Sequence, residues 1–165
     1  MSLGLAHKLP STPLFLHGLN SSIDGTKGQW FHRHFPHVRM QNYQGDLLQR
    51  LAQLDEQVAG LEPLVLVGSS FGGLMAACFA LRHPERCQRL VLLAPALHVT
   101  DYHPPATRIA VPTLVVTGKY DTVCPTDLVV PKARASFATL EVQRVDDDHM
   151  LRRTFPTLDW PNLLA

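Results

Sequence analysis

The sequence predicts an α/β fold, in three layers, built on a mostly parallel sheet. Three observations carry this prediction. Short apolar runs alternate with longer stretches at helical spacing, which is the order expected of βαβ units. The apolar runs are continuous rather than alternating, as in strands buried on both faces. Glycine or proline bounds most of the segments, which separates one element from the next.

In the first half of the chain we expect a polar lead-in at residues 1–10, a buried strand at 14–16 and a loop at 18–28. A helix at 26–35, a weak strand at 38–42 and a second helix at 47–59 follow. Pro36 closes the first helix. The second helix has Asp46 as its N-cap, apolar residues at helical spacing, and Gly60 as its stop.

In the second half we expect strands at residues 64–67, 90–93, 112–118 and 140–145. Between them we expect helices at 71–82 and 125–137 and a loop at 95–111. A loop at 146–149 and a helix interrupted near Pro156 follow. The helix at 71–82 is apolar nearly all round, so we expect it to be buried. The sheet then has about six strands, and ligands bind at the carboxyl ends of such strands.

The amino-acid composition limits the classes of function that we expect. With 165 residues, 45% hydrophobic and 18% charged, we expect a single domain over residues 1–165. A net charge of +1, with no basic cluster longer than Arg152-Arg153, argues against nucleic acid as a partner. We find neither a signal peptide nor an apolar run long enough to span a membrane. Three widely spaced cysteines favour a reducing cytoplasmic setting, and oligomeric state stays open.

The segment around Ser70 carries the chemistry. Gly68, Ser70 and Gly72 fit the G-x-S-x-G pattern of a nucleophile elbow, in which a tight strand-to-helix turn exposes a serine hydroxyl. Ser69 cannot be the central serine because Val67, not glycine, stands two residues before it. The pattern alone equally fits a glycine-rich turn of a nucleotide-binding or flavodoxin-like sheet.

Two further residues fall at the same predicted edge of the sheet. Asp121 follows the strand at 112–118 and His149 follows the strand at 140–145, so Ser, Asp and His occur in the order of an α/β-hydrolase triad. His149 would take the proton of Ser70 and Asp121 would orient His149. Alone, Asp121 could be a turn residue and His149 a helix start. One of Asp146, Asp147 and Asp148 could replace Asp121.

An oxyanion hole needs two backbone donors. We expect the N–H of Phe71, directly after the nucleophile, and the N–H of Leu19, in the loop after the first strand. Gly18, Asn20, Trp30 and Val123 are candidate substrate contacts. We expect no cofactor and no metal, since His32, His34 and His37 are spread over a helix and a proline. Cys78 and Cys124 are expected to pack rather than react.

The stretches His17-Gly18-Leu19-Asn20-Ser21-Ser22, with Lys27 after it, and Gly68-Ser69-Ser70-Phe71-Gly72-Gly73 resemble the small YqiA-like serine esterases of the α/β-hydrolase superfamily. The resemblance spans about residues 13–150. It implies a minimal α/β-hydrolase fold without a cap domain, and an esterase or thioesterase with Ser70, Asp121 and His149 as its triad. The first two of the usual eight strands have no counterpart here, and the loop at 95–111 is too short for a cap.

The sequence therefore predicts a serine hydrolase that cleaves a small-molecule carboxylic ester or thioester through an acyl-enzyme on Ser70. A hydrolase-fold binding or regulatory protein with a weak site is the alternative from another class. An acyltransferase or a peptidase could use the same triad. A lipase acting at membranes is less favoured, for want of a lid or an amphipathic surface helix.

Overall fold

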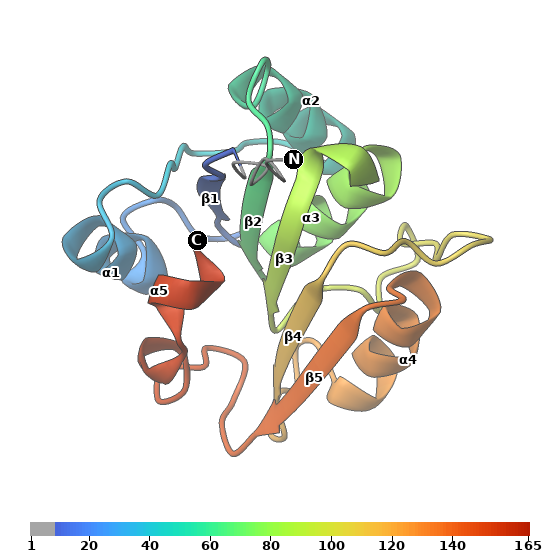
Figure 1. Cartoon of the computed structure of the whole chain (residues 1–165). Coiled ribbons are helices and arrows are strands. Elements are labelled where there is room, and N and C mark those ends of the chain that lie inside the picture. The colour runs from blue at the N-terminus through green and yellow to red at the C-terminus, as the bar shows by residue number, and fades with distance from the viewer. Residues whose placement is uncertain (1–8) are drawn as a thin grey trace, which may run out of the picture.

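A computed structural model describes residues 9–165, so most of the predicted lead-in lies outside the described residues. Five parallel strands form one sheet in chain order, as Figure 1 shows. They are β1 (Thr12–Leu16), β2 (Leu64–Ser69), β3 (Cys87–Leu93), β4 (Thr113–Gly118) and β5 (Leu140–Val145). In register, Leu16 pairs with Gly68, Ser69 with Leu93, and Gly118 with Val145. The carboxyl ends of the strands, and the loops that follow them, therefore meet at one edge.

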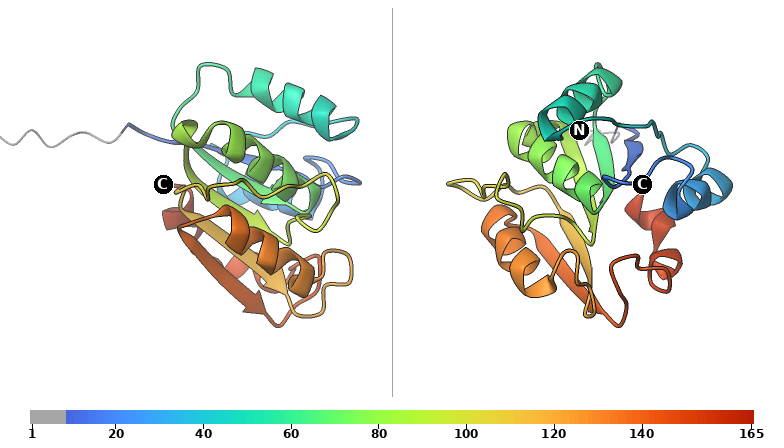
Figure 2. Two further views of the ribbon diagram at one scale, coloured as in Figure 1. Left: turned by 90° about the vertical axis from the view of Figure 1, so that its right-hand side faces the viewer. Right: turned by 180° about the vertical axis from the view of Figure 1, so that it is seen from behind.

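Helices cover both faces of this sheet, which confirms the predicted three-layer class (Figures 1 and 2). The helices are α1 (Thr26–His34), α2 (Leu47–Gln57), α3 (Phe71–Arg82), α4 (Thr126–Ser136) and α5 (Trp160–Leu163). Side chains of α2, α3 and α4 share one apolar core with Leu14 and Leu66, whereas those of α1 and α5 share a second core with Phe15 and Val67. Because neighbouring strand residues point to opposite faces, each strand serves both cores.

The helix ends follow the local chemistry that the sequence predicts. Asp46 accepts a hydrogen bond from the Gln49 N–H at 2.9 Å, and the Gln49 side chain accepts one from the Asp46 N–H at 2.9 Å, which closes a capping box on α2. Gly60 follows this helix with φ +74°, a conformation that glycine adopts without strain. Short 3₁₀ turns occur at Pro84–Arg86 and Phe155–Thr157.

The predicted weak strand at 38–42 is wrong as a strand. Arg39 makes a single isolated bridge with Leu14 on the free side of β1. Two backbone hydrogen bonds form it, Phe15 N to Arg39 O at 3.0 Å and Arg39 N to Pro13 O at 2.9 Å. Within residues 9–165 the sheet therefore has five strands, and this segment only shields its edge.

An aromatic cluster joins α1 to the C-terminal segment. The ring of Trp30 lies 4.8 Å from that of Phe155, and the ring of Phe31 lies 4.9 Å from that of Trp160, in edge-on arrangements. Trp160 is 1% exposed, and its indole N–H donates to Phe155 O at 2.8 Å. The last elements of the chain thus cover the second face of the sheet rather than trailing from it.

Over residues 9–165, no helix has the length and apolar character to cross a bilayer. The three cysteines, Cys78, Cys87 and Cys124, are free thiols.

Candidate active site

Ser70 occupies the sharp corner between β2 and α3. Its backbone has φ 55° and ψ −115°, a strained conformation for a residue with a side chain. A Cβ on Gly68 would lie 2.3 Å from Gly72 O, and a Cβ on Gly72 would lie 2.0 Å from Leu16 O. Both glycines of the motif are therefore sterically required, and the turn holds Ser70 at the carboxyl edge of the sheet.

Asp121 and His149 meet at the same edge. His149 Nδ1 lies 2.8 Å from Asp121 Oδ2, and the Asp121 side chain is fully buried. The other carboxylate oxygen of Asp121 accepts hydrogen bonds from the backbone N–H groups of Val123 and Cys124, each at 2.8 Å. These bonds fix the carboxylate, so the imidazole is held by Nδ1 and its Nε2 remains available to a partner.

Ser70 and His149 line one pocket. Among the described residues, no hydrogen bond joins Ser70 Oγ to His149. Ser70 Oγ makes a long contact with Cys124 Sγ, at 4.0 Å. Hydrogen bonds between catalytic groups are often formed only in the substrate complex. Burial, and then the charge of Asp121, raise the pKa of Cys124 to about 11, so its thiol is a poor nucleophile at neutral pH.

The two predicted oxyanion donors also line this pocket. Phe71 begins α3, so its N–H has no acceptor within the helix, and Leu19 lies in the loop after β1. Throughout residues 9–165, neither N–H donates to a protein acceptor. Both residues thus carry an unpaired backbone donor and lie in the wall of the pocket that contains Ser70, as the predicted oxyanion hole requires.

Arg50, a residue that sequence reasoning missed, contacts both Leu19 and Phe71. It projects from α2, is 5% exposed, and donates to Leu19 O at 3.2 Å and to Gly45 O at 2.9 Å. Its guanidinium also lies 5.3 Å from the centre of the Phe71 ring. No local pattern marks Arg50, because its partners lie 31 and 21 positions away along the chain.

His17 holds the other end of this loop. Its Nδ1 donates to Gly18 O at 2.7 Å, and its Nε2 accepts from the Tyr43 N–H at 2.9 Å. The pKa of His17 is lowered, mainly because the ring is buried. The hydrogen bond to Gly18 opposes this effect, and the charge of Arg50 adds a smaller lowering. With both ring nitrogens bonded to the chain, His17 is a structural residue that holds this loop.

The pocket has a volume of about 630 Å³. The predicted contacts Gly18, Asn20 and Val123 lie in its wall. Trp30 does not, because it packs in the aromatic cluster with Phe155. Sequence reasoning missed Lys27 and His98 as wall residues. His98 Nδ1 is buried and has no hydrogen-bond partner in the described part of the chain.

Asp147 shapes the loop that carries His149. Its carboxylate accepts from the N–H of Asp148 at 2.8 Å, and from the N–H groups of Arg153 and Thr154 and the Thr154 hydroxyl at 3.0–3.1 Å. Burial alone would raise the pKa of Asp147, but these hydrogen bonds outweigh it and lower the pKa. Asp147 is thus a structural carboxylate, while Asp121 is the one that bonds to His149.

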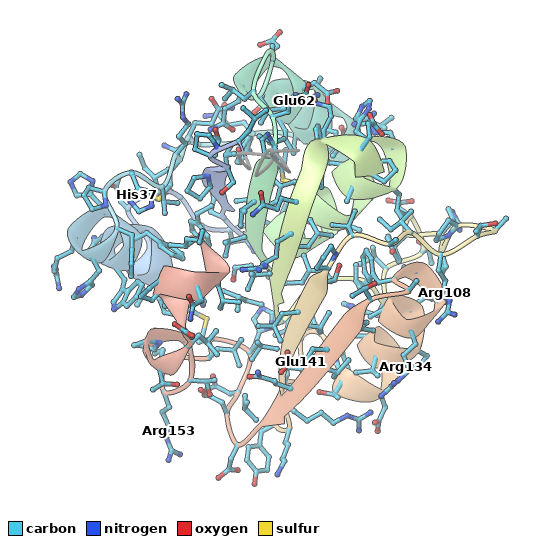
Figure 3. The ribbon with its side chains drawn as sticks, in the orientation of Figure 1. His37, Glu62, Arg108, Arg134, Glu141 and Arg153 are labelled. Atoms are coloured by element: carbon cyan, nitrogen blue, oxygen red, sulfur yellow. The ribbon has the colours of Figure 1, made fainter. Side chains whose placement is uncertain are left out.

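No group of three or more potential metal ligands lies together within residues 9–165. His32, His34 and His37 are exposed, and Figure 3 shows His37 at the outer surface beside α1. The pocket residues present hydroxyl, imidazole and backbone N–H groups, which suits nucleophilic chemistry by the chain itself.

Residues 25–107 match the model of the Hydrolase_4 family, described as serine aminopeptidase, S33. The matched segment is half of the 165 residues and contains the elbow with Ser70. The chain belongs to this family. The match ends before Asp121 and His149, so the predicted acid and the predicted base lie outside the matched segment.

Similar proteins agree on the superfamily. Homoserine O-acetyltransferase of Thermus thermophilus is 38% identical over 78 residues, which is 47% of this chain and 19% of that protein. The matched segment thus spans about a fifth of the length of this curated relative. A YdeN-like hydrolase of Pectobacterium atrosepticum SCRI1043 has a TM-score of 0.69 at 25% identity, over 85% of this chain and 80% of its own.

The esterase EaEST of Exiguobacterium antarcticum has a TM-score of 0.75 at 16% identity, over 94% of this chain and 93% of its own. At that identity the likeness concerns the fold. Together with the family match, these similarities confirm the α/β-hydrolase superfamily that the motifs resemble, and they support a hydrolase.

Proposed function

We propose that the chain acts as a single-domain serine hydrolase that cleaves a small-molecule carboxylic ester or thioester through an acyl-enzyme on Ser70. One observation carries the proposal. Ser70, held in a strained elbow, shares a pocket with His149, whose ring is bonded at 2.8 Å to the buried carboxylate of Asp121. The free thiols fit a reducing, cytoplasmic location.

The reaction follows from these positions. His149 Nε2 takes the proton of Ser70 as Oγ bonds to the acyl carbon, and Asp121 stabilises the imidazolium. The N–H groups of Leu19 and Phe71 bind the oxyanion. His149 then protonates the leaving alcohol or thiol as its bond to the acyl carbon breaks. Water, deprotonated by His149, releases the acid and restores Ser70.

Ser70→Ala is the direct test. It removes the nucleophile, so we expect loss of p-nitrophenyl ester turnover and of labelling by a fluorophosphonate probe. Ser69→Ala is the matched control, because Ser69 is the adjacent serine outside the centre of the motif. Asp121→Asn should lower kcat by about 10⁴-fold, as a wrongly oriented imidazole does. Full activity in Ser70→Ala contradicts the proposal, and a wild-type chain inert to the probe favours a binding protein.

Acyl transfer is the second candidate, because the relative from Thermus thermophilus is named as an acetyltransferase. The acyl-enzyme could pass its acyl group to an alcohol in place of water. Turnover of an acyl donor with and without a primary alcohol separates the two reactions: a transferase forms the new ester, whereas a hydrolase releases the acid.

A further inference from the structure

The pocket wall contains a buried cation, Lys27, that the proposed mechanism does not use. Lys27 lies in the first turn of α1 and is 9% exposed. Its Nζ donates to Met150 O at 2.7 Å and lies 5.7 Å from the centre of the Phe155 ring. One of its three N–H bonds thus has a described acceptor, and that acceptor is neutral. Lysine is rarely buried so far without an anion.

The protein does not supply that anion. No carboxylate oxygen of residues 9–165 forms an ion pair with Lys27. Asp147 uses both of its oxygens on backbone and hydroxyl donors of its own loop, and Asp148 accepts from the Met150 N–H. The pocket wall itself includes no Asp or Glu.

Burial without a paired anion lowers the pKa of the Lys27 ammonium. Burial, and then Arg152, lower the pKa of Lys27 to about 8, against smaller opposite effects of Asp147 and Asp148. The group is still protonated at neutral pH. An anion entering the pocket would therefore meet an available donor in a partly dehydrated site, where charge-assisted hydrogen bonds are strong.

A second observation points to a polar ligand group. His98, in the loop after β3, also lines the pocket, and its buried Nδ1 has no partner among the described residues. Most of the remaining wall is apolar, with Phe15, Phe71 and Val99 among its residues. Such a wall suits a short hydrocarbon chain that ends in a polar group.

We propose that Lys27 binds a carboxylate of the substrate, so that the chain prefers esters or thioesters carrying a negative charge. This substrate class rests on the proposed function, because it concerns the same pocket. The carboxylate could belong to the acyl group, as in a dicarboxylic half-ester, or to the leaving group.

The test compares matched charged and neutral esters. Mono-p-nitrophenyl adipate against p-nitrophenyl heptanoate probes the acyl side. The heptanoyl ester of 4-hydroxybenzoate against that of methyl 4-hydroxybenzoate probes the leaving group. In Lys27→Met we expect the charged-to-neutral ratio of kcat/KM to fall by about 10- to 100-fold for one of the two pairs, the range for a hydrogen bond to a charged group.

Two further variants serve as controls. Lys27→Arg keeps the charge and should retain most of the ratio, while Lys132→Met makes the same change on α4, away from the pocket, and should leave it unchanged. An equal loss on all four esters in Lys27→Met, or unchanged ratios for both pairs, overturns the proposal. The equal loss would make Lys27 only a support for the His149 loop, through its bond to Met150 O.

A binding experiment separates this proposal from the proposed function. Monomethyl adipate and dimethyl adipate are titrated into Ser70→Ala, which cannot turn over esters, and into Ser70→Ala with Lys27→Met, using NMR shifts. We expect the monoester to bind more tightly, and the preference to vanish without Lys27. If the wild type hydrolyses no ester, the proposed function fails and this titration alone decides on Lys27; equal binding of both ligands rejects its role.

Discussion

At the scale of single residues, the Arg50 guanidinium contacts both proposed oxyanion residues without lying in the pocket wall. It contacts the carbonyl of Leu19 in the loop after β1 and the ring of Phe71 at the start of α3, so one side chain links two segments that are far apart in sequence. A shift of a donor by a fraction of an ångström weakens an oxyanion interaction. Arg50 is therefore expected to act as a positioning residue.

Arg50→Met should lower kcat by about 10- to 100-fold and change KM little, because Leu19 and Phe71 would no longer be held in place. Affinity for a trifluoromethyl ketone, which forms an oxyanion on Ser70, should fall in parallel, whereas a purely structural loss would reduce the active fraction alone. Arg134→Met is the control, since Arg134 is exposed and points outward from α4 in Figure 3. A normal kcat in Arg50→Met would refute the role.

Candidate site residues can be proposed from the sequence where the chemistry has a local pattern. The elbow at Gly68–Gly72 and the positions of Asp121 and His149 after their strands are of this kind. Arg50 and His98 have no such pattern, because their places beside the pocket arise only when separate segments of the chain meet. Trp30 fails as a pocket contact for a related reason: an aromatic residue on a helix packs wherever other rings are available.

At the scale of elements, the loop after β5 depends on one carboxylate. Asp147 is 7% exposed and takes four hydrogen bonds from residues 148–154, which fold the chain back around His149. Asp147→Asn should cost about 1–3 kcal/mol in the free energy of unfolding, because an amide leaves some of these donors unpaired.

The pH dependence of this effect has a defined sign. The folded-state pKa of Asp147 lies below its usual 3.8. Its stabilising contribution is therefore present above about pH 4 and is lost as the pH falls through the lower folded value. Urea unfolding of wild type and Asp147→Asn should show curves that converge below pH 4, with the exposed Asp101→Asn as control. A constant difference in the free energy of unfolding across this range would contradict the stabilising role of the Asp147 carboxylate.

Element boundaries follow the sequence most closely where caps or glycines mark them. The helix predicted at 71–82 is confirmed residue for residue, and the Asp46 cap is present. The segment at 38–42 is different. It has the composition of a weak strand, but only Arg39 bridges to β1, and no local signal tells how far pairing continues.

At the scale of the molecule, the two cores depend on different parts of the chain. The core shared by α1 and α5 is closed by residues 155–164, with Trp160 at its centre. This segment packs together with α1 against the second face of the sheet.

Trp160→Ala should lower the free energy of unfolding by about 3–5 kcal/mol, the usual cost of truncating a buried large aromatic residue. Urea denaturation followed by circular dichroism measures the loss. Leu48→Ala removes an apolar side chain that is 76% exposed and should change stability by less than about 0.5 kcal/mol. A loss in Trp160→Ala no larger than in Leu48→Ala would mean that the C-terminal segment is not needed to close the core.

The position of the site between two halves of the chain has a kinetic consequence. Ser70 and the two proposed oxyanion residues precede the proline-rich loop at 95–111, while Asp121 and His149 follow it, and β3 pairs with β4 across that division. A backbone cut in the exposed part of this loop, at 106–108, would leave the proposed nucleophile on one fragment and the proposed base on the other. Formation of the site would then change from a first-order folding event to a second-order encounter, whose rate depends on the concentrations of both fragments.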